Sequence, residues 1–352
     1  MKTGKRMKRG YALALAFLLT LPCLAKIRTE AALAIDTAAV CSLTVSVEDS
    51  DYKDDFNEMS IPVTLYRVAD VDASGRFTAV EPFTKVDFGS VSNTTTADDW
   101  MKLAETAAGC LEGDPEVPEG NVSTVNVEKG REGSQNAFGK FQNLKTGMYL
   151  IVPADTYNAD HTVRYTFTPY LTALPSSEYT LTGTGSEDWD YDTEVGLKAG
   201  EETQYGKLNI TKVLSNYNET LGRTSFVFQI EGRDETGTVV YSNVISTTHE
   251  GAGNETVTLD KIPAGLDVTV TEVYSGASYR IVGSDTDSDV IWSDSAVEAG
   301  VAQGKGPNGE AGVTFTNEYG GGNRGGYGVT NHFDSDGNGG WVWENPTTPA
   351  EE

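Results

Sequence analysis

The sequence is poor in the residues on which most enzymes and metal sites depend. It has three cysteines and three histidines in 352 residues, and no two histidines are spaced as metal ligands. It also has no Gly-x-Ser-x-Gly nucleophile elbow. Carboxylates are so abundant that a glycosidase pair remains compatible with the composition, but none stands out. We therefore expect no cofactor, no metal and no enzyme with turnover.

Basic residues are also scarce. The chain has 26 Lys and Arg against 52 Asp and Glu, a net charge of −26, which argues against nucleic acid and anionic membranes as partners. Basic residues cluster in the first nine positions, before an apolar run over 11–25 and the small-residue site Ala32-Leu-Ala34. The run is too short to span a membrane and is typical of a secretory signal peptide. We expect a signal peptide at 1–34 and an extracellular protein.

Two cysteines, Cys41 and Cys110, lie beyond this leader. A disulfide between them would close a long loop and contribute about 4 kcal/mol. Two unpaired thiols fit the sequence equally well, because the sequence gives no distance between them.

The remaining chain divides into a first domain at 42–200, an acidic linker at 201–205, a second domain at 206–320 and a Gly-rich flexible tail at 321–352. Alternating apolar residues predict strands at 43–47, 61–68, 76–80, 148–152, 165–171 and 193–198. One helix is predicted to begin after Thr96 and to end at Gly109. The Gly-, Pro- and charge-rich residues 112–137 are expected to form a surface loop.

Three strand-like segments of the second domain each carry one reactive side chain on an apolar face. Period-two alternation places Lys212, Glu272 and Asn317 on the same faces as their apolar neighbours. Burial lowers the pKa of a lysine and raises that of a glutamic acid, so a neutral amine can attack the carboxamide while the acid shuttles protons. A buried Lys–Glu ion pair with a hydrogen-bonding asparagine is the alternative. The segments are Leu208-Asn-Ile-Thr-Lys212, Val268-Thr-Val-Thr-Glu272 and Val313-Thr-Phe-Thr-Asn317.

The residues around this triplet resemble the collagen-adhesin B-type (Cna-B) domain of Gram-positive surface proteins and pilins. The similarity covers about 204–320, and its most specific part is the closing Phe-Thr-Asn-Glu-Tyr. It implies an intramolecular isopeptide bond between Lys212 and Asn317, with Glu272 as the catalytic residue. It also implies an all-β fold of two tandem immunoglobulin-like sandwiches, the first with one helix and a long loop.

An internal repeat confines this chemistry to the second domain. The turn that ends at Gly147 and the strand after it match the turn that ends at Gly265 and its strand, which indicates a supersecondary unit shared by both halves. Extending the registers puts Val47, Ala154 and Ala199 where the second domain has its three reactive residues. We expect no crosslink in the first domain.

Lys198 stands at the end of the first domain's last predicted strand, opposite in face to Ala199. Its surroundings resemble the end of the N-terminal domain of sortase-assembled pilins, where an exposed lysine joins subunits, although Gly-Leu-Lys here replaces the Tyr-Pro-Lys of that motif. A solvated linker lysine is the alternative. No Leu-Pro-x-Thr-Gly signal or apolar anchor follows Tyr319, so such a subunit is expected to end a polymer and to have no transmembrane anchor.

In the tail, Asp334, Asp336 and Asn338 begin like a calcium-binding loop, but position twelve is Asn345 in place of the required Glu. A flexible acidic segment is the favoured interpretation.

The sequence as a whole predicts a structural cell-surface protein, a pilin subunit whose partners are sortase and other pilin subunits. The alternative is a surface adhesin that binds a host matrix protein or glycan through the first domain.

Overall fold

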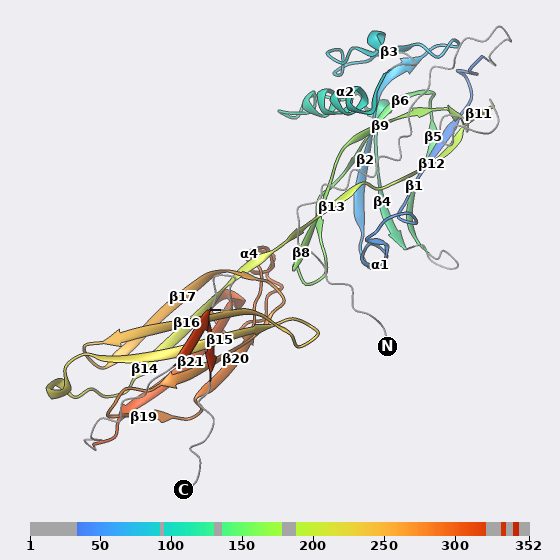
Figure 1. Cartoon of the computed structure of the whole chain (residues 1–352). Coiled ribbons are helices and arrows are strands. Elements are labelled where there is room, and N and C mark those ends of the chain that lie inside the picture. Colours follow the sequence, from blue (N-terminus) through green and yellow to red (C-terminus); the bar gives the residue numbers. More distant parts are fainter. Residues whose placement is uncertain are drawn as a thin grey trace, which may run out of the picture. The chain divides into compact units, whose positions relative to one another are not determined.

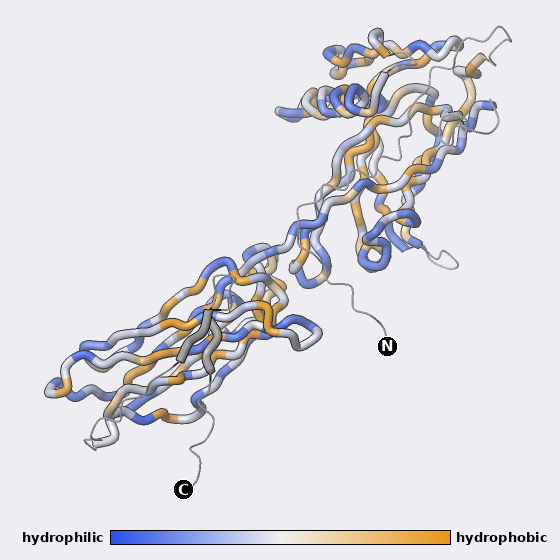
Figure 2. The backbone as a smooth tube through the Cα atoms, viewed as in Figure 1, coloured by the Kyte–Doolittle hydropathy of each residue, from blue (hydrophilic) through white to orange (hydrophobic). Residues whose placement is uncertain are grey.

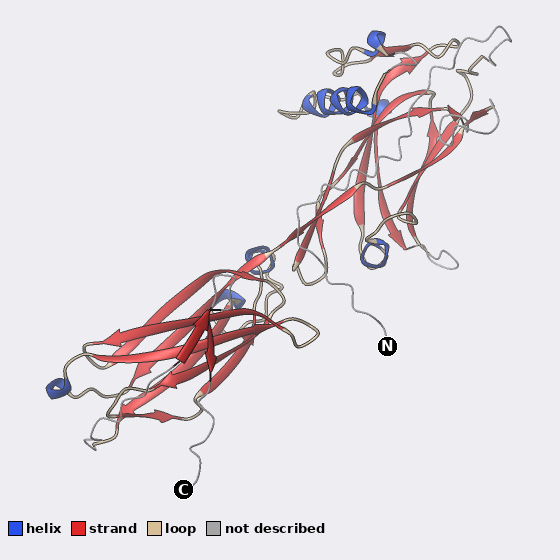
Figure 3. Cartoon of the chain, in the orientation of Figure 1, coloured by secondary structure: helices blue, strands red, loops and turns tan. Residues whose placement is uncertain are grey.

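The computed structural model describes residues 34–91, 95–129, 136–177 and 188–321, and the backbone of 332–335 and 341–344. Strands dominate, and the expected all-β class is confirmed (Figure 3). The chain forms two compact units (Figure 1). Unit 1 comprises the chain up to Thr156 together with Tyr165–Glu201, and unit 2 comprises Tyr157–Arg164 and the chain from Glu202 onward. The predicted signal peptide, except Ala34, lies outside the described residues.

Unit 1 is built on an eight-stranded sheet in the order β12-β1-β5-β4-β2-β6-β9, with β3 paired to β2. A small sheet pairs β10 with β11, and a second one, whose strands each have residues assigned to either unit, places β8 between β13 and β7. The strands are β1 (Cys41–Ser46), β2 (Ile61–Val71), β3 (Phe77–Ala79), β4 (Val122–Lys129), β5 (Ala137–Leu144), β6 (Gly147–Pro153), β7 (Thr156–Tyr157), β8 (Val163–Phe167), β9 (Tyr170–Leu174), β10 (Ser176–Ser177), β11 (Trp189–Asp190), β12 (Asp192–Gly196) and β13 (Ala199–Thr203).

The main helix of unit 1 is α2 (Ala97–Gly109), bounded as predicted. Thr96 and Asp99 form a reciprocal capping box at its start. Trp100 and Ala104 are buried in a cluster with residues of β6 and β9, so the helix covers part of the sheet. A second, one-turn helix is α1 (Lys53–Phe56). No helix in the described part of the chain has the length and hydropathy to cross a membrane.

The expectation of a loop throughout 112–137 is wrong, because β4 and the first residue of β5 lie within it. Val127 of β4 is buried, and β4 pairs with β2 along its length and with β5 at its end. Val125 and Val127, two residues apart, are a signal for a strand that the Gly-, Pro- and charge-rich composition of the segment conceals.

Of the two alternatives that the sequence left open for Cys41 and Cys110, the structure has the unpaired thiols; the first begins β1, whereas the second packs beside the α2 cluster. Two further expectations need correction. The predicted linker at 201–205 is mostly strand, since β13 ends at Thr203 and β14 begins at Tyr205. In the tail, β22 (His332–Ser335) and β23 (Trp341–Glu344) pair as an antiparallel hairpin.

Unit 2 is a sandwich of two four-stranded sheets, in the orders β17-β14-β21-β19 and β16-β15-β18-β20. Its apolar core draws on both sheets, as sheet-on-sheet packing requires, and Figure 2 shows hydrophobic residues (orange) along the strands of this unit. The strands are β14 (Tyr205–Leu214), β15 (Thr224–Arg233), β16 (Val239–His249), β17 (Gly253–Pro263), β18 (Asp267–Tyr274), β19 (Tyr279–Val282), β20 (Thr286–Val290) and β21 (Ala311–Tyr319), with a short helix α4 (Asp294–Glu298).

Each unit pairs its first strand in parallel with a strand near the end of that unit's sequence. Val45 of β1 pairs with Val195 of β12, and Ile210 of β14 pairs with Val313 of β21. The alignment of the internal repeat in the sequence predicts that these two strand pairs have the same register. At the lysine position of unit 2, unit 1 has the fully buried Val47, an apolar side chain that offers no amine for a crosslink.

Candidate functional site

Lys212, Glu272 and Asn317 meet inside unit 2. Lys212 lies on β14 and Asn317 on the neighbouring β21, while Glu272 projects from β18 in the opposite sheet. Their exposed fractions are 0%, 4% and 0%. The structure therefore brings together the three side chains that the alternation pattern aimed at the interior.

The Glu272 carboxyl group stands between the other two side chains. Its Oε2 lies 3.1 Å from Lys212 Nζ, and its Oε1 accepts a hydrogen bond of 2.6 Å from Asn317 Nδ2. Asn317 Nδ2 also donates to the backbone carbonyl of Ser275 over 3.2 Å, while Asn317 Oδ1 is buried without a hydrogen-bond partner. One carboxyl group is thus in contact with both the amine and the carboxamide.

Burial disfavours charge on both ionisable members. Desolvation lowers the pKa of Lys212, although the nearby Glu272 opposes this shift. Desolvation likewise raises the pKa of Glu272, against the opposing effects of Lys212 and Asn317. Both shifts increase the share of a neutral amine beside a neutral acid. That is the protonation state in which lysine is a nucleophile and the acid can give a proton.

Phe226 is a fourth member that the sequence did not single out. Its fully buried ring lies 4.4 Å from Lys212 Nζ, measured to the ring centroid. The alternation of β15 shows that Phe226 faces inward, but only the packing of the two sheets shows what it touches.

Lys198 does not match the expectation of an exposed amine. It lies just after β12 and is partly buried, with Nζ 4.7 Å from the centroid of the Tyr170 ring. Burial lowers its pKa. The predicted strand ended two residues too late, since β12 ends at Gly196.

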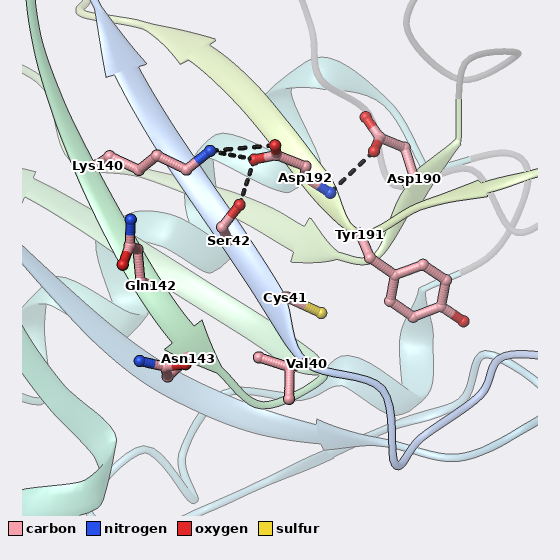
Figure 4. A pocket seen from close by; sticks show the side chains of 9 residues that line it. All are labelled: Val40, Cys41, Ser42, Lys140, Gln142, Asn143, Asp190, Tyr191 and Asp192. Atoms are coloured by element: carbon pink, nitrogen blue, oxygen red, sulfur yellow. Dashed lines mark hydrogen bonds and ion pairs between the residues drawn. The ribbon is translucent and has the colours of Figure 1, made fainter.

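A shallow pocket in unit 1 is lined by residues of β1 and β5, the end of β11 and the start of β12 (Figure 4). Lys140 Nζ contacts the Asp192 carboxylate at 2.8 and 3.1 Å, and Ser42 donates to the same carboxylate. Cys41 at its edge has its pKa raised to about 11 by burial and by Asp190, so it is a protonated, unreactive thiol near neutral pH. Lys140 and Asp192 thus pair with each other, and the Asp190 carboxylate accepts a hydrogen bond from the backbone N–H of Asp192.

No group of His, Cys, Asp and Glu within the described ranges is arranged to hold a metal ion. Of the weak calcium candidates, Asp334 lies in β22. Asp336 and Asn338 lie outside the described residues.

A family model described as a domain of unknown function (DUF5979) matches residues 208–320, a segment that contains all three members of the site. No curated protein matches the sequence.

The chain is similar to solved structures of Gram-positive pilins. The minor pilin GBS52 of Streptococcus agalactiae is 12% identical with a TM-score of 0.23, over 79% of this chain and 96% of that chain. The major pilin SpaD of Corynebacterium diphtheriae is 11% identical with a TM-score of 0.25, over 82% and 99%. The basal pilin SpaE of Lactobacillus rhamnosus GG is 10% identical with a TM-score of 0.28, over 79% and 99%. Similarities this distant assign no function. A function has to be argued from the geometry of the site.

Proposed function

We propose that this chain is a structural subunit of an extracellular surface assembly, a pilin, whose unit 2 closes a covalent bond between Lys212 and Asn317. The observation that carries this proposal is the contact of a buried amine and a buried carboxamide with one buried carboxyl group. A plain ion pair would need neither the asparagine nor its placement at the carboxyl group.

The reaction joins Lys212 Nζ to Asn317 Cγ and breaks the bond from Cγ to Nδ2. Glu272 takes a proton from the attacking amine and gives one to the departing nitrogen, which leaves as ammonia. Starting from the neutral amine and the neutral acid, the products are an amide, a protonated Glu272 and neutral ammonia, so atoms and charge balance. Folding supplies the proximity that makes a carboxamide reactive once per molecule.

The bond would have a mechanical role. It links β14, which opens unit 2's sandwich, to β21, its last strand in the main sheets, and these strands pair in parallel. Tension that enters along β14 and leaves along β21 would then pass through a covalent tie and not through the hydrogen bonds between the strands. This property suits a fibre subunit.

Intact mass of the secreted protein tests the bond. The parent is expected to be lighter than its sequence by one ammonia, whereas Glu272→Gln is expected to have its full sequence mass. Glu219→Gln, an exposed glutamate in a turn of the same unit, is the matched control and should lose ammonia like the parent. A parent of full sequence mass would refute the proposal.

Assembly is a separate part of the proposal. Lys198 is the candidate amine for attack on an acyl-sortase intermediate, and its partial burial means that the end of unit 1 must open locally for the enzyme to reach it. The second candidate function is an adhesin that binds a host matrix protein or glycan through unit 1, whose helix α2 is set on the sheet. Ladders of polymer that survive boiling in detergent favour the pilin; monomers that bind such a ligand favour the adhesin.

A further inference from the structure

The carboxamide of Asn317 has one definite orientation in the site. Its Nδ2 donates over 2.6 Å to Oε1 of Glu272 and over 3.2 Å to the backbone carbonyl oxygen of Ser275. Both hydrogens of the nitrogen are therefore used. Within the part of the chain that the structure describes, no group donates to the buried Oδ1. The nitrogen, which is the leaving group of the proposed reaction, is thus the atom that faces the catalytic acid.

The two acceptors differ in what they allow. A carboxyl group accepts hydrogen bonds when it is ionised and can donate one when it is protonated, so Glu272 alone could hold the carboxamide by its nitrogen or by its oxygen. A backbone carbonyl can only accept. If the carboxamide were turned over, Oδ1 would face the Ser275 oxygen with no hydrogen between them. The Ser275 carbonyl therefore selects the observed orientation in either protonation state of Glu272.

The direction of this carbonyl is set by a tight turn. Ser275 directly follows β18, and the next residue, Gly276, has a φ of +80°, which glycine adopts without steric cost. A Cβ on Gly276 would lie 2.8 Å from Thr224 Oγ1 and 3.1 Å from Tyr279 Cδ2. The carbonyl of Gly276 in turn accepts a hydrogen bond from the N–H of Tyr279 over 3.4 Å. Close packing and this hydrogen bond hold the peptide group between Ser275 and Gly276 in place.

We propose that the backbone carbonyl of Ser275 is a positioning group for the crosslinking reaction, which turns Nδ2 of Asn317 toward Glu272 so that the acid protonates the leaving nitrogen and not Oδ1. This inference rests on the proposed isopeptide bond. The bond from Lys212 Nζ to Asn317 Cγ forms and the bond from Cγ to Nδ2 breaks. The proton that Glu272 gives to Nδ2 is replaced by one from the attacking amine.

The proposal predicts the sign of a rate change. If the carbonyl holds the leaving nitrogen at the acid, weakening it as an acceptor slows the reaction, by about fivefold for the loss of one ordinary hydrogen bond. If Glu272 instead acted by donating to Oδ1, the carbonyl would hold the carboxamide the wrong way round. Weakening it would then speed the reaction.

An ester in place of one peptide bond tests this prediction. Glycolic acid in place of Gly276 turns the Ser275 carbonyl into an ester carbonyl, a weaker acceptor, and leaves every side chain unchanged. Ammonia loss is followed by intact mass on full-length chains made by cell-free synthesis. The chain with the ester at 276 is expected to react about fivefold more slowly than the parent. The same replacement at Gly251, where a Cβ would meet nothing within 4 Å, is the matched control and should react at the parental rate.

A spectroscopic readout separates positioning from a general loss of stability. In Lys212→Met the bond cannot form, so the carboxamide of Asn317 stays intact and its Nδ2 protons can be observed by NMR. The ester at 276 is expected to move one of these two signals upfield, because that proton loses part of its hydrogen bond. The ester at 251 should move neither. A coupling across the hydrogen bond, between Nδ2 and the carbonyl carbon of Ser275, is expected in Lys212→Met without any ester.

Each other outcome counts against a particular step. A chain with the ester at 276 that reacts as fast as the parent, or faster, overturns the inference, and so do Nδ2 signals that do not move. If the parent itself loses no ammonia, the proposed bond fails; if the parent reacts and only the ester chain behaves otherwise, the inference alone fails. Circular dichroism shows whether each chain is folded. If the ester chain is not, the coupling in Lys212→Met decides, and its absence overturns the inference.

Discussion

The covalent tie should make unit 2 much more stable than its hydrogen bonds and core alone would. Lys212 and Asn317 are 105 positions apart in the sequence. Closing a loop of that length removes chain entropy worth about 4.8 kcal/mol at 25 °C from the unfolded state. For a domain of this size, each kcal/mol moves the melting temperature by about 4 °C, so the expected difference is about 20 °C.

Glu272→Gln is the variant that isolates this effect. Glutamine has nearly the shape of glutamate and retains polar atoms toward Lys212 and Asn317, but it cannot act as the acid. Calorimetry on the full chain is expected to show the transition of unit 2 about 20 °C lower in the variant than in the parent. The transition of unit 1 is expected to be unchanged, and so identifies which melting event belongs to which unit.

A variant that cannot form the bond tests whether Glu272 stabilises unit 2 through the bond or through its own contacts. In Lys212→Met no bond can form, so adding Glu272→Gln should change the stability by only about 1 kcal/mol, the worth of an ordinary hydrogen bond. A drop as large in the Lys212→Met background as in the parent would show that the glutamate stabilises by contacts and not through the bond. Equal melting temperatures and equal mass deficits for parent and Glu272→Gln would refute the assigned role of Glu272.

Three further predictions follow from particular contacts. Gly206→Ala should destabilise unit 2 severely, because a Cβ there would lie 1.7 Å from a backbone carbonyl oxygen, whereas a Cβ at Gly251 meets nothing within 4 Å; urea unfolding should show a loss for Gly206→Ala and almost none for Gly251→Ala. If Lys198 is the acceptor amine, Lys198→Arg should abolish incorporation into detergent-resistant polymers by a pilus sortase, and Lys145→Arg, at an exposed lysine of the same unit, should not. Burial lowers the pKa of His249, so the folded unit binds fewer protons than the unfolded chain below about pH 6.5 and its stability falls as the pH falls through the folded pKa. The melting temperature should therefore drop more between about pH 7.5 and pH 5 in the parent than in His249→Gln; equal drops would contradict this assignment.

Local patterns predicted much of the fold. The capping box at Thr96 and the apolar stripe of α2 can be read from adjacent residues, because both depend on contacts within one or two helical turns. Period-two alternation similarly placed the strands of unit 2 that carry the reactive residues. The same reasoning missed β4, whose strand signal is short and follows a Gly- and Pro-rich stretch.

Whether a side chain near the end of a strand is buried was harder to predict. Lys198 was expected to be exposed from its place after a strand, yet it lies over Tyr170. The aromatic ring that covers it comes from β9, a different part of the chain. No spacing in the sequence encodes that contact, since a side chain near a strand end is buried or exposed according to what packs against it.

The sequence by itself determined which way Lys212, Glu272 and Asn317 point, because the direction of a side chain on a strand is a local property of the backbone. Only the tertiary structure decided that Glu272, from the opposite sheet, comes between the amine and the carboxamide. It also decided that the backbone carbonyl of Ser275 meets the same carboxamide. Two facing sheets about 10 Å apart let side chains meet across the core only when twist and register agree, and that agreement is set by the packing of the whole unit.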